Sequence, residues 1–500
     1  MSTNSRQDTV LEVGGRLAHG PSDKLIQTAF KQELDDQAPL FAAMGWVDIA
    51  HTLVLIDAGI VPSEPGRELL AALSKLQDHP ADFIPDPALG DLYTNREAWL
   101  AGQTQASTWL GAGRARREAT TTAFLMKLRE SLLGLAQALT AAGLAFTDRA
   151  EELRTALMPD YTYLLAAQPT SFGHYLLGFV YPMLRDLERI RALYARVNLS
   201  PAGCGSTNGS RLPQDRERLC ELLGFDGLVT HARDAMWQAD LPIEAAARLT
   251  AILVNLDRLA EDLQIFSTEE FGLVELDDCH ARASKIMPQK KNPFALTHVR
   301  GLANRMIGIL ATSAASGRTS SGQSDNRLAP YGMIPRAVED TQGAVELMGE
   351  VASLLSFNTQ RGRARMDDGS ALATDLADVL VLKCGLDFRQ AHRLIGYLTR
   401  QMLSQGGLNR LTPGQLAEAA ERVLSRKLEI SLSALQNALD PDAALAARIT
   451  QGGAAPEPMA TMLEECEQAL MATERWVSTC SARLRISEES LIRMTIEYLR

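Results

Sequence analysis

Residues 243–266, IEAAARLTAILVNLDRLAEDLQIF, decide the fold class of this chain. Large apolar side chains recur there mostly at steps of three and four residues: Leu249, Ile252, Leu253, Leu256, Leu259, Leu263 and Phe266. This spacing forms one apolar stripe along a long helix, and the stripe must be buried against neighbours. Similar patterns fill 115–149, 171–197, 294–318 and 336–358. The sequence therefore predicts an all-α protein with a central bundle of long helices.

Stretches rich in Pro, Gly, Ser and Asn interrupt these patterns, and we expect loops or turns there: 79–91, 198–215 and 451–458. Residues 361–378 separate the long central helices from a region of shorter ones. We therefore predict an N-terminal helical domain, a central long-helix bundle and a C-terminal helical domain, at 1–118, 119–365 and 366–500.

Composition limits the class of protein. The 500 residues are 46% hydrophobic, which is ordinary for a globular chain, and the net charge of −11 argues against nucleic-acid binding. No apolar run reaches the roughly 18 residues of a membrane span, and no signal peptide is evident. The scattered cysteines, without a CxxC pair, indicate reduced thiols. We expect a cytoplasmic protein that binds neither nucleic acid nor membrane.

Common metal and cofactor motifs are missing from the sequence. The histidines form no HxxxH pair and no cluster with metal-ligand spacing, so we expect no metal site. Residues 203–209, GCGSTNG, begin like a dinucleotide fingerprint but lack its third glycine, so we expect a plain loop. A P-loop and a GxSxG serine-hydrolase elbow are also absent. Polar loops are the remaining candidates for a functional site.

The first candidate, here called the arginine segment, is GAGRARRE (111–118), where Arg114, Arg116 and Arg117 follow two glycines at a predicted helix start. Acidic residues are normally preferred at that end of a helix. Arginines beside glycines, which let the backbone approach a ligand, suit an anion-binding site. A solvated basic helix start is the plain alternative.

The second candidate, the hydroxyl segment, is MPDYTYLLAAQP (158–169). It places the hydroxyls of Tyr161, Thr162 and Tyr163 on a predicted turn before a helix, with Gln168 close behind in the sequence. The plain alternative is that Thr162 simply caps the helix.

The third candidate, the serine loop, is ASKIMPQKKNP (283–293), with Ser284, Lys285, Lys290 and Asn292. A lysine-rich surface loop is the plain alternative. Together, the three segments offer arginines, hydroxyls, lysines and amides in an acidic chain. Such a set of groups suits a small, multiply carboxylated substrate.

The serine loop resembles the signature Ser-x-x-Met-x-x-Lys-x-Asn of the fumarase/aspartase superfamily, at Ser284, Met287, Lys290 and Asn292. Further stretches are similar to argininosuccinate lyases, so the resemblance covers nearly the whole chain: 14–25, 159–190, 212–225, 269–278 and 373–392. It implies a homotetramer with a shared helical core and active sites built from several subunits. It also implies that no metal or organic cofactor is required.

The family reaction is an anti β-elimination from a succinyl compound, and fumarate usually leaves. A weakly acidic proton departs next to a carboxylate, so cations and amides must stabilise the dianion that forms. By resemblance, Ser284 is the base, and a positioned acid assists the leaving group. We expect Thr162 and Tyr163 to complete the catalytic set. The expected substrate contacts are Arg114, Arg116, Arg117, Lys285, Lys290, Asn292 and Gln168.

Departures from the family pattern fall on substrate contacts. The family's serine and asparagine in the arginine segment are Ala115 and Arg117 here. Its histidine in the hydroxyl segment is Tyr163, a candidate proton donor, and the acidic partner of that histidine is Thr297. Lys285 stands where a second small hydroxyl is usual. The added positive charge suits an anionic group on the substrate.

Three hypotheses remain open. The chain is a lyase with a substrate other than argininosuccinate, a true argininosuccinate lyase, or a catalytically silent protein on the same scaffold. The family's guanidino-binding stretch aligns roughly with QSDNRL (323–328), and this change argues against argininosuccinate. Intact Ser284, Lys290 and Asn292 argue against a silent site.

Overall fold

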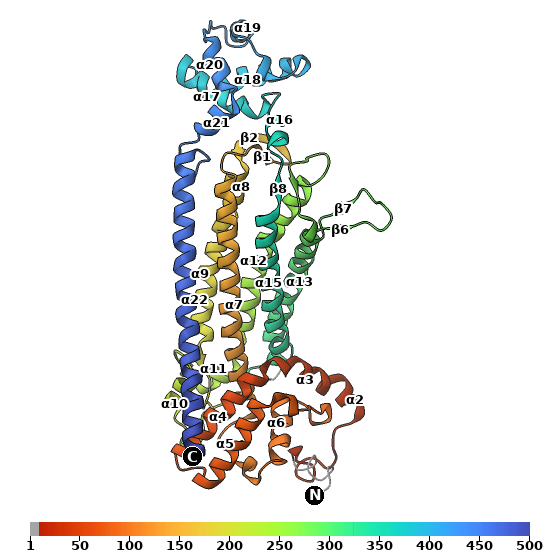
Figure 1. Ribbon diagram of the computed structural model, residues 1–500, viewed down its shortest axis with the longest axis vertical. Helices are drawn as coiled ribbons and strands as arrows, with labels where there is room; N and C mark the ends of the chain where they lie inside the picture. The colour runs from red at the N-terminus through yellow and green to blue at the C-terminus, as the bar shows by residue number, and fades with distance from the viewer. Residues whose placement is uncertain (1–9, 324) are drawn as a thin grey trace.

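The computed structural model describes residues 10–323 and 325–500 of the chain. The first nine residues of the predicted N-terminal domain, and position 324 of the 323–328 stretch, lie outside the described residues. Long helices run along the long axis of the molecule, with groups of shorter helices at both ends (Figure 1). The fold is therefore mostly helical, as the sequence predicts.

The long helices pack side by side in the middle of the molecule: α7 (Arg116–Glu152), α9 (Val180–Val197), α12 (Asp240–Phe266), α13 (Phe294–Gly317), α15 (Pro330–Leu354) and α22 (Pro456–Leu499). Every residue of the predicted stripe from Leu249 to Phe266 is buried. Helix α12 packs against α13, and α7 against α15, around one common core. Helix α22, although predicted in the C-terminal domain, packs along α7 and α9 as part of that core.

Shorter helices occupy the two ends. The lower end in Figure 1 holds α2 (Asp23–Leu25), α3 (Lys31–Gln37), α4 (Phe41–Asp57), α5 (Ser63–Asp78) and α6 (Leu92–Ala101). The upper end has its own apolar core, within α17 (Ala373–Cys384), α18 (Phe388–Met402), α19 (Pro413–Leu424) and α20 (Leu432–Ala438). The remaining helices are α8 (Phe172–Leu177), α10 (Arg216–Leu222), α11 (Ala232–Trp237), α14 (Asp325–Leu328), α16 (Thr359–Ala364) and α21 (Pro441–Ala446).

One helical stretch, Asp23–Asp57, is long and apolar enough to cross a membrane by composition alone. However, 67% of its most apolar window is buried inside the protein, mainly through α4. This stretch is therefore packed as a core helix of the N-terminal region.

Short strand pairs interrupt the helical fold. The hydroxyl segment is a correction to the sequence analysis, because it forms a hairpin of β1 (Leu157–Thr162) and β2 (Leu165–Ser171) rather than a turn before a helix. The hairpin also contacts elements that are distant in the sequence, including α16. A local sequence pattern does not reveal such contacts. The sequence also predicts a helix up to residue 358. Helix α15 ends earlier, at Leu354, because the next residues form strand β8. The other strands are β3 (Leu199–Ser200), β4 (Gly227–Leu228), β5 (Val274–Glu275), β6 (Arg282–Ala283), β7 (Lys291–Asn292) and β8 (Ser356–Phe357).

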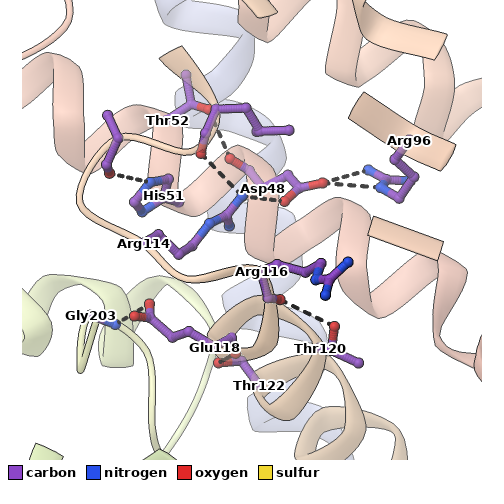
Figure 2. A network of polar contacts seen from close by, with 12 residues as sticks. Asp48, His51, Thr52, Arg96, Arg114, Arg116, Glu118, Thr120, Thr122 and Gly203 are labelled. Atoms are coloured by element: carbon purple, nitrogen blue, oxygen red, sulfur yellow. Dashed lines mark hydrogen bonds and ion pairs between the residues drawn. The ribbon is translucent and has the colours of Figure 1, made fainter. Parts of the chain in front are cut away.

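A buried carboxylate ties the N-terminal helices to the start of α7 (Figure 2). Asp48 on α4 accepts hydrogen bonds from Arg96 Nε at 3.0 Å and Arg114 Nη2 at 2.8 Å. All three side chains are almost completely buried. Nearby, a ring nitrogen of His51 lies 3.1 Å from the carbonyl oxygen of Ala112. These contacts join α4, α6 and the arginine segment.

We expect Asp48→Asn to lower the free energy of unfolding by roughly 3–5 kcal/mol, because it leaves two buried guanidinium groups without a counter-charge. Denaturant unfolding followed by circular dichroism measures this loss. The matched control is Asp35→Asn on the exposed side of α3, for which we expect a change within about 0.5 kcal/mol. Equal stability of Asp48→Asn and the unaltered protein would contradict the anchoring role.

Candidate active site

The arginine segment leads directly into α7, which begins at Arg116. The buried guanidinium of Arg114 binds Asp48 and lies over the ring of Tyr93, so its expected contact with substrate stays a prediction. Arg116 remains half-exposed, with Nη1 3.0 Å from a carboxylate oxygen of Asp91. Arg117 is partly buried and lines a small cavity. Arg117 therefore faces a cavity.

Glu118 is a buried residue of this segment that the sequence analysis missed. Its carboxylate accepts a backbone N–H bond from Gly203 at 2.7 Å (Figure 2). It accepts a second one from Gly205 at 2.6 Å. Burial raises the pKa of Glu118 to about 7, although Arg114 and the two N–H groups act in the opposite direction. Both glycines have positive φ angles, of 73° and 67°, which allow the loop to turn around the carboxylate. The glycines of GCGSTNG therefore hold a glutamate of α7.

The hydroxyl segment places Thr162 and Tyr163 at the tip of the β1–β2 hairpin and Gln168 within β2. Thr162, Tyr163 and Gln168 are exposed, and 98% of Tyr163 is accessible to solvent. Tyr163 and Leu164 form the turn with φ angles of 54° and 61°. Positive φ is unfavourable for such residues, so the hairpin holds the tyrosine outward at some conformational cost.

The serine loop projects from the side of the bundle between β6 and β7 (Figure 1). Ser284 Oγ accepts backbone N–H bonds from Met287 at 3.0 Å and Ile286 at 3.4 Å. The Ser284 N–H in turn donates to the carbonyl oxygen of Lys290 at 3.1 Å. Asn292 donates its side-chain amide to the carbonyl oxygen of Arg282 at 2.9 Å. The loop is therefore folded by its own backbone around the serine hydroxyl.

The lysines of the serine loop have different surroundings. Lys291 is held by Glu275 at 3.1 Å and Asp278 at 2.7 Å. Lys285 and Lys290 are exposed, and Lys290 lines an open groove beside the loop. Lys285 and Lys290 thus remain accessible to an incoming anion.

The three predicted segments do not meet within the described chain. The start of α7 lies at the lower end of the bundle, the β1–β2 hairpin at the upper end, and the serine loop on the side (Figure 1). The 37 residues of α7 alone span about 55 Å at 1.5 Å per residue. The 323–328 stretch does reach the arginine segment, because Arg327 and Arg117 line the same cavity.

Within residues 10–323 and 325–500, no group of three or more His, Cys, Asp or Glu side chains is arranged to hold a metal ion.

Comparison with known proteins gives consistent matches over most of the chain. A family model described as lyase matches residues 88–308, and one described as argininosuccinate lyase C-terminal matches residues 370–446. The argininosuccinate lyase of Methanococcoides burtonii is 32% identical, with 91% of this chain and 92% of that protein covered. The argininosuccinate lyase of Methanothrix thermoacetophila is 33% identical, with 90% and 91% covered.

Solved structures of EDDS lyase are also similar to this chain. A complex with formate has a TM-score of 0.86 and 27% identity, with 96% of each chain covered. A variant with bound fumarate has a TM-score of 0.86 and 26% identity, with the same coverage.

The buried carboxyl of Glu118 predicts a pH dependence of stability. Its pKa is raised from 4.5 to about 7, so the folded chain holds this proton more tightly than the unfolded chain. The free energy of unfolding should therefore fall as pH rises from about 4.5 to 7, by roughly 3 kcal/mol at most. Glu118→Gln should remove this pH-dependent part of the free energy of unfolding. Denaturant unfolding at several pH values measures the free energy of unfolding of the Glu118→Gln and unaltered proteins. If the two plots of this free energy against pH run parallel, Glu118 does not titrate in this range.

Proposed function

This chain belongs to the fumarase/aspartase superfamily, and on that premise we propose that it is a carbon–nitrogen lyase. It eliminates a nitrogen leaving group from a succinyl compound and releases fumarate or a related unsaturated acid. The observation that carries the proposal is the serine loop, which keeps Ser284, Lys290 and Asn292 and folds around the serine hydroxyl. The similarity to argininosuccinate lyases and to an EDDS lyase with bound fumarate supports it.

The backbone around Ser284 suits a serine that acts as a base. A free hydroxyl is a poor base, so its oxyanion must be stabilised before it can take a proton from carbon. The N–H groups of Met287 and Ile286 already point at Oγ, and hydrogen bonds to an ionised acceptor are stronger than those to a neutral one. The exposed ammonium of Lys285, next in the chain, adds positive charge near the oxyanion.

We propose that Lys290 and Asn292 hold the carboxylate on which charge develops. Pre-placed donors lower the barrier most when they meet the charge that forms in the transition state. The Lys290 ammonium is exposed in the groove, whereas the Asn292 amide donates to the loop itself. We therefore propose that substrate binding draws Asn292 away from the carbonyl oxygen of Arg282.

We further propose that the site is assembled between subunits of a homotetramer, because one chain keeps the three segments apart. The accessible face of α13 is suited to close helix packing. Outside the adjoining backbone of its own helix, a Cβ placed on Gly301 or Gly308 would have no described atom within 4 Å. The side chains of Tyr163, Leu165 and Ile286 are apolar and exposed, and in such an assembly they would be buried against neighbouring subunits.

The proposed substrate is not argininosuccinate. Arg117 replaces a neutral amide of the family pattern, and Arg327 lies beside it, so a cationic guanidino group would meet like charges. Argininosuccinate lyase itself is the second candidate, since relatives of that name are up to 33% identical over most of the chain. Turnover of argininosuccinate at a rate matching the best alternative substrate would favour the second candidate.

We expect Ser284→Ala to reduce elimination by roughly 10²- to 10⁴-fold, because the base that accepts the carbon-bound proton is lost. The assay incubates the protein with fumarate and a panel of amines, hydroxylamine, hydrazine and nitrite, and follows the loss of fumarate absorbance. Argininosuccinate is tested in the elimination direction.

The matched control is Ser433→Ala, an exposed serine on α20 in the C-terminal helices. It should retain full activity. If the Ser284→Ala and unaltered proteins behave alike on every compound, the chain is a catalytically silent protein on the lyase scaffold and the proposed function is wrong.

Mixing two inactive variants tests the shared site. Arg117→Ala and Ser284→Ala each damage every site of their own homotetramer. If Arg117 and Ser284 of one site come from different subunits, co-refolded mixtures contain some sites with both residues intact. We therefore expect activity to return in the mixture. A mixture as inactive as its components, with mixed tetramers verified by differential tags, would argue against the shared site.

A further inference from the structure

The serine loop leaves the body of the protein at a buried histidine that the reaction described above does not use. His280 ends a one-turn helix, Asp278–His280, and its side chain is only 3% exposed. Across the described stretch 281–294, which follows it, no residue is fully buried. Buried side chains resume at Ala295, within α13. His280 is therefore the last buried side chain before the chain enters the serine loop.

A histidine is a costly side chain at this position. Both ring nitrogens of His280 are buried and have no hydrogen-bond partner among the described residues. A buried polar group without a partner loses its hydrogen bonds to water and gains none in return. An apolar ring would fill the same space without this cost. The nitrogens of His280 therefore point to a second arrangement of the loop base, in which they are satisfied.

A carboxylate on α15 is close enough to become the partner of this ring. Oε2 of Glu350 lies 3.5 Å from Nε2 of His280, which is longer than the roughly 2.7–3.2 Å of an N–H···O hydrogen bond. The Glu350 side chain is 71% exposed, so it can turn without disturbing the core. A neutral imidazole carries one N–H, and its hydrogen bond to a carboxylate is charge-assisted. A small approach of the two side chains would therefore bond the base of the serine loop to α15.

The turn that contains His280 joins a fixed segment to the projecting loop. On the fixed side, β5 pairs with β8, which directly follows α15. On the loop side, β6 pairs with β7, and Lys291 of β7 binds Asp278 of the turn at 2.7 Å. The N–H of Ser284 continues this pairing to the carbonyl oxygen of Lys290 at 3.1 Å. The loop therefore moves as one unit with the turn, and the position of His280 sets the position of Ser284.

We propose that His280 is a positioning residue for Ser284, because its ring pairs with Glu350 when substrate binds and the pair fixes the base of the serine loop against α15. The inference rests on the proposed lyase function, in which Ser284 is the base. His280 lies four residues before Ser284 and acts through the loop backbone. A base misplaced by about 1 Å can cost roughly 10²-fold in rate, so a contact that fixes the loop contributes directly to elimination.

Hydrogen exchange tests this pairing without requiring turnover. Mass spectrometry follows the amides of 281–294 in the full-length protein, with and without fumarate as the probe. We expect saturating fumarate to slow exchange there roughly 10-fold, because pairing of His280 with Glu350 suppresses local opening. His280→Phe keeps a buried ring but removes both nitrogens, and it should abolish this slowing. Glu350→Gln removes the charge of the acceptor and should weaken the slowing.

Steady-state kinetics on the same variants, with the amine of the panel that reacts fastest with fumarate, measures the effect on elimination chemistry. We expect His280→Phe to lower kcat roughly 10- to 100-fold with KM within about twofold, since substrate still binds but meets a misplaced base. The double variant with Glu350→Gln should be no slower than His280→Phe, because both changes remove one bond.

Matched controls come from similar side chains away from the loop base. His392→Phe changes an exposed histidine of α18, and Glu346→Gln changes an exposed glutamate one turn earlier on α15. Both should keep kcat and the response of 281–294 to fumarate. His280→Phe removes unpaired polar atoms, so its melting temperature should not fall, and folding is verified separately from loop position.

Two results would overturn the inference. In the first, fumarate leaves exchange of 281–294 unchanged, or His280→Phe responds to fumarate as the unaltered protein does. In the second, His280→Phe lowers the melting temperature and speeds exchange throughout the core helices, which would assign His280 to packing alone. Failure of the lyase function is a different result, because turnover would not depend on Ser284 while the exchange of 281–294 still depended on His280.

Discussion

The length of α7 is the constraint on which the candidate site depends. A helix rises 1.5 Å per residue, so this helix holds the arginine segment about 55 Å from its other end, next to which the chain turns into the β1–β2 hairpin. A packed helix of this kind cannot shorten, since both ends and the middle are embedded in the same core. The arginine segment and the β1–β2 hairpin therefore cannot meet within one chain.

Two buried carboxylates fix where this long helix starts. Asp48 holds Arg114 just before the first turn, and Glu118 within the first turn binds the N–H groups of Gly203 and Gly205. The first contact ties the helix start to α4, and the second ties it to the 198–215 loop. Together they set the position of Arg117, which lies between these anchors in the sequence and faces the cavity with Arg327.

The groups with proposed chemical roles differ from these anchors in exposure. Tyr163 and Lys285 stand on exposed turns, and Ser284 is held by its own loop backbone. His280, with its proposed positioning role, is the exception, because its buried ring nitrogens have no hydrogen-bond partner in the described chain.

The sequence by itself determined the helical bundle and the position of the signature in a loop, because apolar spacing and local turn residues are short-range properties. The stripe ending at Phe266 is buried as its pattern predicts. Tertiary structure alone decided the role of Arg114, the burial of Glu118, and the meeting of Arg117 with Arg327. Each of these depends on which distant side chain lies opposite, as Asp48 does for Arg114. Periodicity along one helix carries no information about such a partner.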